Sequence, residues 1–329
     1  MNKYILSLSV FCMASVSVSA ETYDQFLAGV RTELGQKNMD ISIFDAAMDG
    51  HKSPNEKVFK KLKKQPESTF TFMGYYNRLV SSVRVATGKN KLEKHSVELK
   101  EISAQYNFPV ETMLALWGIE SAYGKLQGDF KIIPSLADLA YKSHRKDFFR
   151  SELIKAVGIV QDGHIDLANL KGSWAGAMGQ CQFMPSSFYR FAADGNGDGR
   201  KDIWNTEADV FASTANYLTK SGWVYNKNWG EAVTLTKILP KIKLSENGLS
   251  EKKTMAEWYA MGVAHKDVRL QKRYASDERI ARLFIPQGPS KRAYLVYENF
   301  DVIMKWNRSS YFAFSVLSLA DRIAGREAL

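Results

Sequence analysis

Cysteine is nearly absent from this chain, which has two in 329 residues. Cys12 lies in a segment that we expect to be removed, so Cys181 would remain alone and no internal disulfide could form. The remaining residues, about 309 after 20 are subtracted from 329, are enough for a large core or two packed subdomains. No histidine stands near Cys181 in the sequence, which favours a packing residue over a nucleophile. A histidine brought close by the fold is the alternative.

Apolar runs long enough to span a bilayer are also lacking. Residues 5–18 form an apolar stretch, but it is too short and too rich in serine for a membrane anchor. The stretch follows Lys3 and ends in the small residues Val18-Ser19-Ala20, a pattern typical of a cleaved secretory signal. Phe11 precedes Cys12, where a lipoprotein signal needs a small residue. The sequence therefore predicts a signal at residues 1–20, export to the periplasm and no lipid anchor.

Repeats, low-complexity tracts and linkers rich in proline, glycine or serine are absent too. Helical apolar periodicity dominates the chain up to Trp229, and apolar runs typical of strands follow it. We expect helices over residues 23–50, 55–84, 92–106, 136–141, 148–161, 208–221, 254–261 and 309–323. We expect strands over residues 232–236, 280–285 and 293–297. The predicted fold class is α+β, mainly helical, with a small inserted β-containing region.

Acidic residues are fewer than basic ones, 35 against 45, which gives a formal charge of +10. Loss of Lys3 with the signal would leave about +9. Such a charge suits an anionic polymer, either nucleic acid or an acidic cell-wall glycan. Export favours the wall and argues against nucleic acid. Ordinary solvated surface is the alternative explanation for most of the lysines.

Glu120 lies in an unusually apolar segment, residues 115–124, with the sequence ALWGIESAYG. Pro109 suits the start of a helix here and Gly124 suits its end. The apolar residues three, four and seven positions before Glu120 share its helix face, so Glu120 belongs to a buried stripe. Burial and the negative end of the helix dipole should raise the pKa of Glu120, as a general acid requires. The alternative is a structural glutamate bonded to a backbone amide.

A second unusual segment, residues 169–187, interleaves glycine and alanine with polar and aromatic residues. Small residues let a ligand or another backbone approach closely. Ser173 and Gln182 can form hydrogen bonds with an uncharged polar ligand. Neither phosphate-loop nor dinucleotide-binding glycine spacing is present. A tight helix–helix crossing with a capped turn is the alternative.

The segment from Asp194 to Asn205 resembles an EF-hand loop. Oxygen ligands fall at Asp194, Asn196, Asp198 and Asp202, loop positions 1, 3, 5 and 9, and glycine stands at position 6. Asn205 stands at position 12, where a bidentate glutamate is expected. We therefore expect at most weakly bound calcium or sodium, with a plain turn as the alternative.

These segments together resemble the lytic murein transglycosylases of the membrane-bound B type. The resemblance extends from about Tyr23 to Gly325, and its motifs lie at residues 115–124, 170–187, 194–204, 213–218 and 306–325. It implies an N-terminal helical region (21–90), a lysozyme-like catalytic core (91–230), a small β-containing region (231–300) and a C-terminal helix that returns to the core (301–329). It also implies a monomer that acts on peptidoglycan and requires no cofactor.

The resemblance assigns one catalytic residue, Glu120. The residues that it implies for glycan binding are Ser173, Gln182, Tyr217, Asn307 and, by a less certain alignment, Tyr75. Phe312 departs from the family pattern, because relatives often carry a tyrosine there and a hydroxyl contact would be lost.

The implied reaction cleaves the β-1,4 bond between N-acetylmuramic acid and N-acetylglucosamine. The two segments that carry the predicted site, residues 115–124 and 172–187, contain a single carboxylate, Glu120. Most glycosidases use two carboxylates, so the substrate would have to supply the nucleophile and leave a 1,6-anhydro sugar. A hydrolytic muramidase and a non-catalytic wall-binding protein are the alternatives.

Overall fold

The computed structural model describes residues 21–62, 70–236, 242–246, 248–265, 267, 274–286 and 292–327. The predicted signal, residues 1–20, lies outside the described residues. Within the described ranges, no helix combines the length and apolarity needed to cross a bilayer.

Helices form most of the chain before the sheet, as the apolar periodicity predicts. Their bounds are α1 (Tyr23–Gln36), α2 (Ile41–Met48), α3 (Glu56–Leu62), α4 (Phe72–Leu79), α5 (Ser82–Lys94), α6 (Ser96–Tyr106), α7 (Val110–Ser121), α8 (Ile132–Lys142), α9 (Lys146–Gln161), α10 (Pro185–Phe191) and α11 (Glu207–Lys220). A 3₁₀ turn, η2 (Leu167–Asn169), and a two-residue antiparallel ladder of β1 (Phe130–Lys131) and β2 (Lys171–Gly172) lie between them.

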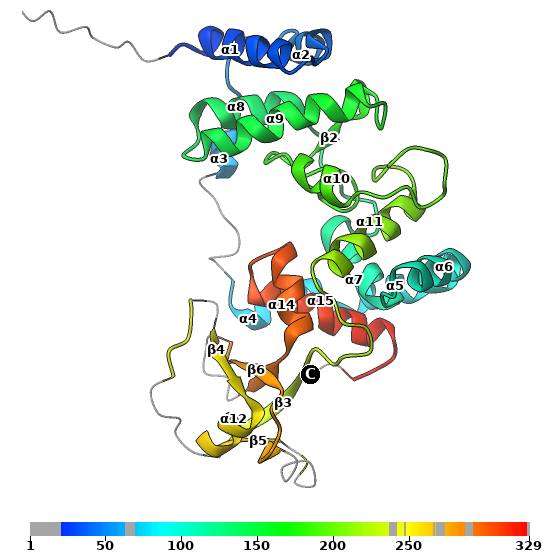
Figure 1. The fold of residues 1–329 in the computed structure, drawn as a ribbon, viewed down its shortest axis with the longest axis vertical. Helices are drawn as coiled ribbons and strands as arrows, with labels where there is room; N and C mark the ends of the chain where they lie inside the picture. Colours follow the sequence, from blue (N-terminus) through cyan, green and yellow to red (C-terminus); the bar gives the residue numbers. More distant parts are fainter. Residues whose placement is uncertain are drawn as a thin grey trace, which may run out of the picture.

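An antiparallel sheet of five strands follows, in the spatial order β4-β6-β7-β3-β5. The bounds are β3 (Gly230–Leu235), β4 (Leu249–Thr254), β5 (Val263–His265), β6 (Ile280–Phe284) and β7 (Ala293–Val296), with α12 (Met255–Met261) between β4 and β5. The chain then returns through α14 (Glu298–Trp306) and α15 (Ser310–Ile323). Figure 1 shows α1 and α2 at one end of the molecule, the sheet at the other, and α7, α14 and α15 between them.

Both faces of β7, which lies inside the sheet, are buried, and this explains its apolar run. Alternate residues of a strand point to opposite faces. In β7, Ala293 and Leu295 join a cluster with Trp258 of α12, whereas Tyr294 and Val296 join the main core. Tyr294 packs on Phe314 of α15 with ring centroids 4.7 Å apart. Since α15 also packs along α7, the sheet is fixed against the part of the molecule that carries Glu120.

Several predicted elements differ from the observed ones. The helix expected over residues 92–106 is two helices, because α5 ends at Lys94 and α6 starts at Ser96. The predicted regional boundary at residues 90 and 91 falls inside α5, which packs on α7 and α15. Strands β4 and β5 were not predicted at all. The division of the chain into regions remains a prediction.

Candidate active site

The helix that carries Glu120, α7, is buried on nearly every side. Met113, Leu116 and Trp117 are almost wholly inaccessible, as the predicted stripe requires, but so are residues on the other faces, including Gly118. Glu120 itself is partly exposed, as is its neighbour Ile119. The carboxylate therefore stands at the edge of the core, where it can meet a ligand.

The sequence predicts that Gly124 ends α7, but the helix ends earlier. The helix ends at Ser121, because Ala122 and Tyr123 both adopt left-handed backbone angles, with φ of 51° and 59°. Tyr123 is held in place by its hydroxyl, which donates to the carbonyl of Arg84 at 2.8 Å. Gly124 is also left-handed, and a Cβ there would clash with the side chain of Gln180. The glycine thus permits a close approach after the helix rather than ending it.

Glu120 receives a hydrogen bond from a residue far away in the sequence. The indole Nε1 of Trp306, the last residue of α14, donates to Oε1 of Glu120 at 2.8 Å. Glu111, in the first turn of α7, is nine positions before Glu120, which is about 13 Å along a helix axis. That separation exceeds the roughly 5–9.5 Å between the two carboxylates of a glycosidase. Glu111 is therefore too far along the helix to be the second carboxylate of such a pair.

Aromatic rings surround Trp306 and bring two predicted segments together. Its ring centroid lies 4.7 Å from that of Tyr217 in α11 and 5.2 Å from that of Phe183 in the glycine-rich segment. The Tyr217 hydroxyl donates to the carbonyl of Lys305 at 2.8 Å, so it holds the end of α14. Burial raises the pKa of Tyr217, which keeps the hydroxyl protonated as a donor.

The glycine-rich segment is a folded loop and not a helix crossing. Ser173 Oγ accepts hydrogen bonds from the backbone N–H groups of Ala175 and Ala177, at 3.3 and 3.0 Å. A Cβ on Gly172 would clash with the carbonyl of Ala177. The small residues of this turn therefore let one backbone approach another. Ser173 fixes the turn, in addition to the glycan contact that the resemblance implies.

Gln182 is held in a left-handed conformation, with φ of 51°. Its amide nitrogen donates to the carbonyls of Gln127 and Gly179, at 3.0 and 2.9 Å. Among the residues that the structure describes, none donates to its amide oxygen, which can accept from a ligand. The segment after α7 and the glycine-rich loop are thereby joined through one predicted site residue.

Gln180 connects the segments of the candidate site, and the sequence analysis did not select it. Its Oε1 accepts from the indole of Trp117 at 2.6 Å, and its Nε2 donates to the carbonyl of Trp204 at 2.9 Å. It is buried and connects α7, the glycine-rich loop and the segment before α11. The only signal in the sequence was its place in the motif, since its partners lie 63 and 24 positions away.

The remaining predicted residues lie around α14, α15 and α4. Asn307 follows Trp306 directly, and its Oδ1 accepts from the backbone N–H of Ser309 at 3.0 Å. Tyr75 of α4 lies beside Tyr311 of α15, with ring centroids 6.1 Å apart. Phe312 is buried, with 3% of its surface exposed, so its ring belongs to the core. Tyr311, which the sequence analysis did not select, is more exposed than Phe312.

Comparison with known proteins identifies the family. A profile described as "Transglycosylase SLT domain" matches residues 22–321. This chain belongs to that family. Membrane-bound lytic murein transglycosylase B of Escherichia coli (strain K12) is 28% identical over 254 residues, which is 77% of this chain and 67% of the relative.

Solved structures of transglycosylases share the fold. SltB3 from Pseudomonas aeruginosa in complex with NAG-NAM-pentapeptide is 35% identical, with a TM-score of 0.81 over 93% of this chain and 80% of that chain. Slt35 from Escherichia coli in complex with bulgecin A is 23% identical, with a TM-score of 0.77 over 92% of each chain. The predicted family and the predicted lysozyme-like, mainly helical fold class are thus confirmed.

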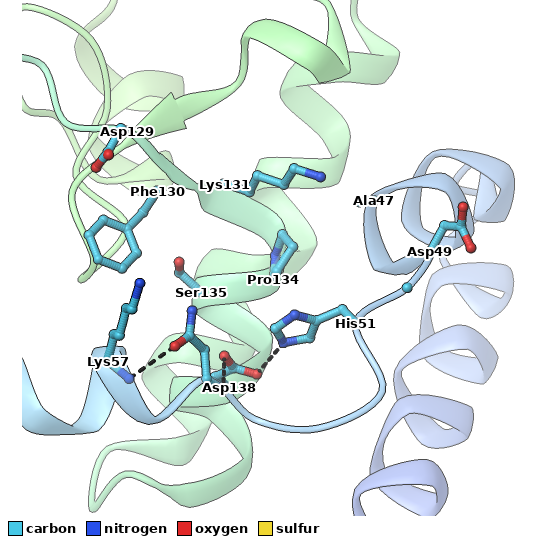
Figure 2. A pocket seen from close by; sticks show the side chains of 12 residues that line it. Ala47, Asp49, His51, Lys57, Asp129, Phe130, Lys131, Pro134, Ser135 and Asp138 are labelled. Carbon is cyan, nitrogen blue, oxygen red and sulfur yellow. Dashed lines mark hydrogen bonds and ion pairs between the residues drawn. The ribbon is translucent and has the colours of Figure 1, made fainter.

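Two cavities of this transglycosylase domain border the segment between α7 and α8. One, of about 610 Å³, borders the segment after α7 and includes Gln127, Lys171 and Trp204. The other, of about 420 Å³, lies between α8 and the loop after α2, and none of the predicted site residues lines either cavity. Figure 2 shows His51 at this second cavity, pointing to Asp138 of α8. The first cavity is linked to the candidate site through Gln127, whose carbonyl accepts from the amide of Gln182.

Cys181 is a packing residue, as its sequence context favours. The side chain is buried, and burial raises the pKa of the Cys181 thiol to about 12. Its sulfur lies 3.8 Å from the hydroxyl of Thr214 in α11. A thiol of this kind is protonated at neutral pH and is a poor nucleophile.

The predicted metal loop uses its oxygen atoms for other contacts. Asp194 accepts backbone N–H groups of Gly197 and Gly199, each at 2.7 Å. Both carboxylate oxygens of Asp202 accept from the amide of Asn205. Below the loop, burial raises the pKa of Asp209 to about 6.

Asn205, in place of the bidentate glutamate of an EF-hand, makes the loop a poor fit for a tightly bound metal. Asp202 is turned to the end of its own loop and does not complete a ligand set with Asp194 and Asp198. In the described part of the chain, no group of three histidine, cysteine, aspartate or glutamate side chains could hold a metal ion.

Proposed function

We propose that this chain is a lytic transglycosylase that cleaves the β-1,4 bond between N-acetylmuramic acid and N-acetylglucosamine in peptidoglycan. The single observation that carries the proposal is Glu120, a partly exposed carboxylate at the end of a buried helix, oriented by the indole of Trp306 at 2.8 Å. Its place in the family motif supports the same assignment. No cofactor is required, because the reaction is a proton transfer coupled to an internal displacement.

Glu120 acts first as an acid and then as a base. As an acid, it protonates the oxygen of the leaving sugar. The N-acetyl oxygen of the muramoyl residue stabilises the anomeric carbon in the meantime. The Glu120 carboxylate then removes the proton of the muramoyl 6-hydroxyl, whose oxygen attacks that carbon. The product is a 1,6-anhydro sugar, and no water is consumed.

The other predicted residues bind the glycan. The Gln182 amide oxygen and the Asn307 side chain can orient the sugar amide and hydroxyl groups. The partly exposed rings of Tyr217 and Tyr75 are suited to the apolar face of a sugar ring. Ser173 shapes the loop and lies next to β2, whose residue Lys171 lines the cavity of about 610 Å³.

Relatives support this assignment. SltB3, at 35% identity, has been solved both with NAG-NAM-pentapeptide and with NAG-anhNAM-pentapeptide. The anhydro sugar of the second complex is the kind of product that we propose here. We further propose that the chain acts in the periplasm as a monomer without a lipid anchor. Calcium, present in a structure of Slt35, would bind only weakly to the Asp194 loop of this chain.

Mass analysis of the sugars released from purified peptidoglycan tests the function. Released fragments should carry anhydro ends, about 18 mass units lighter than hydrolytic products because the tethered hydroxyl replaces water. A preparation with Glu120→Gln serves as the blank for contaminating activity. Reducing muramic acid ends that react with borohydride would identify a hydrolytic muramidase. Binding without any release would identify a wall-binding protein.

A further inference from the structure

Trp306 is the residue that contacts the carboxylate of Glu120 from the far end of the chain. The two residues are 186 positions apart, and the bond joins the end of α14 to the end of α7. An indole N–H can only donate. Whatever the protonation state of Glu120, its Oε1 must therefore present a lone pair to Trp306.

We propose that Trp306 is a positioning residue for the reaction, which fixes the rotamer of Glu120 and directs the acid proton to Oε2. A carboxylic acid accepts best at its carbonyl oxygen, so a donor bound to Oε1 favours the proton on the other oxygen. The proposal rests on the proposed role of Glu120 as acid and base. It adds a residue that acts through Glu120.

The indole is itself held rigidly, which a positioning role requires. Its ring packs against Tyr217 and Phe183, at centroid distances of 4.7 and 5.2 Å. The residue before it, Lys305, is fixed at two points: its carbonyl accepts from Tyr217 and its Nζ donates to the carbonyl of Ser221 at 2.6 Å. The end of α14 is thus joined to α11, and the N–H group has little freedom to turn away from Glu120.

The bond should matter in both halves of the reaction. A donor to a carboxylate stabilises the ionised form more than the neutral form. It therefore supports the state of Glu120 that accepts the proton of the 6-hydroxyl. In the first half, the same bond holds the acid in one orientation, so less freedom is lost when the leaving oxygen is protonated.

Replacement of Trp306 by phenylalanine tests the proposal. Trp306→Phe keeps an aromatic ring between Tyr217 and Phe183 but removes the N–H group. We expect kcat to fall on the order of 10- to 100-fold, as for loss of a hydrogen bond to a charged group, while KM changes less than about 2-fold. The limb of the pH–rate profile that reports ionisation of Glu120 should move to higher pH, because the ionised form has lost a donor.

A second tryptophan offers a matched control. The indole N–H of Trp223 is buried and has no hydrogen-bond partner among the described residues, and its ring packs on Phe108. Trp223→Phe therefore changes ring size without removing a hydrogen bond, and we expect turnover and pH profile to stay near wild type. If Trp306→Phe unfolds, incorporation of β-(3-benzothienyl)alanine at position 306 keeps the bicyclic shape and replaces only the N–H group.

The outcomes separate this proposal from the proposed function. If Glu120→Gln retains turnover, the assignment of Glu120 is wrong and the role of Trp306 falls with it. If Glu120→Gln is inactive but Trp306→Phe, or the benzothienyl variant, matches wild type in kcat and pH profile, the function stands and the positioning role is wrong. A folded variant with reduced kcat and a displaced pH limb supports both.

Discussion

At the scale of single residues, Glu120 could be predicted from the sequence, but its partner could not. The apolar helical pattern before Glu120 and the surrounding motif both single out this carboxylate. Trp306 lies 186 positions away, and no local pattern indicates that its N–H group meets Oε1. Gln180 was missed for the same reason, since it acts through Trp117 and Trp204. Residues that act through long-range contacts are visible only in the folded chain.

The first prediction concerns Glu120→Gln. Glutamine keeps the shape of the side chain and an oxygen for the Trp306 N–H, so the fold should be intact. It cannot give up or take a proton, and we expect turnover to fall by about two to four orders of magnitude. Release of soluble fragments from purified peptidoglycan measures the loss.

Glu111→Gln is the matched control, because Glu111 stands on the same helix in its first turn. It should release fragments at nearly the wild-type rate and unfold at a similar temperature. Comparable losses in the two variants would mean that α7 needs its charges for folding, and that Glu120 has no special role.

At the scale of elements, long periodic segments were predicted well and short or polar ones were not. Strands β3, β6 and β7 lie inside the sheet and carry apolar runs. The unpredicted strands, β4 and β5, form its two edges; β4 has the polar sequence LSEKKT and β5 has three residues. Edge strands need fewer apolar residues, so their periodicity is weak. The pairing that creates them comes from neighbours distant in sequence.

Asp138 joins α8 to the N-terminal helices and leads to the second prediction. It is wholly buried and accepts from the Tyr23 hydroxyl at 2.7 Å and from the backbone N–H of Asn55 at 2.9 Å, while His51 Nε2 lies 2.8 Å away. Asp138→Asn replaces one acceptor oxygen with a donor. We expect the free energy of unfolding to fall by about 2–4 kcal/mol, since buried donors lose their partner.

Chemical denaturation of Asp138→Asn measures this loss. Asp147→Asn, an exposed change in the first turn of the neighbouring helix α9, serves as the control and should cost less than about 0.5 kcal/mol. Equal stability of the two variants would show that the buried network does not hold the N-terminal helices.

The Asp194 loop gives the third prediction. Its oxygen atoms already accept backbone N–H groups, and Asn205 stands where the acidic ligand of an EF-hand is expected. We expect calorimetry to detect calcium binding no tighter than about 10⁻³ M, the weak end of such loops. Asn205→Glu should strengthen binding by restoring the missing ligand. Micromolar affinity in the unaltered chain would contradict this and make Glu207 or a water molecule the replacement ligand.

At the scale of the whole molecule, the sequence predicts the fold class but not how the parts meet. Phe284 and Tyr294 of the sheet pack on Phe314 of α15. Helix α15 in turn packs on α7. Apolar periodicity shows that each of these residues is buried, but not against which partner. The docking of the sheet beside the candidate site is therefore a result of the structure alone.

The net charge of the chain leads to the last prediction. A protein with a formal charge of +10, or about +9 without the predicted signal, is attracted to a polymer that carries carboxylates, such as the peptide stems of peptidoglycan. The attraction between solvated charges is screened over about 10 Å at 0.1 M salt. Raising sodium chloride from about 50 to about 300 mM should therefore weaken sedimentation with purified peptidoglycan roughly 5-fold or more, whereas kcat at saturating substrate should change less than about 2-fold.

Peptidoglycan whose carboxylates have been converted to amides is the control, and binding to it should be weak at both salt concentrations. If salt has no effect on the native polymer, sugar contacts dominate the affinity and the basic residues serve only as solvated surface.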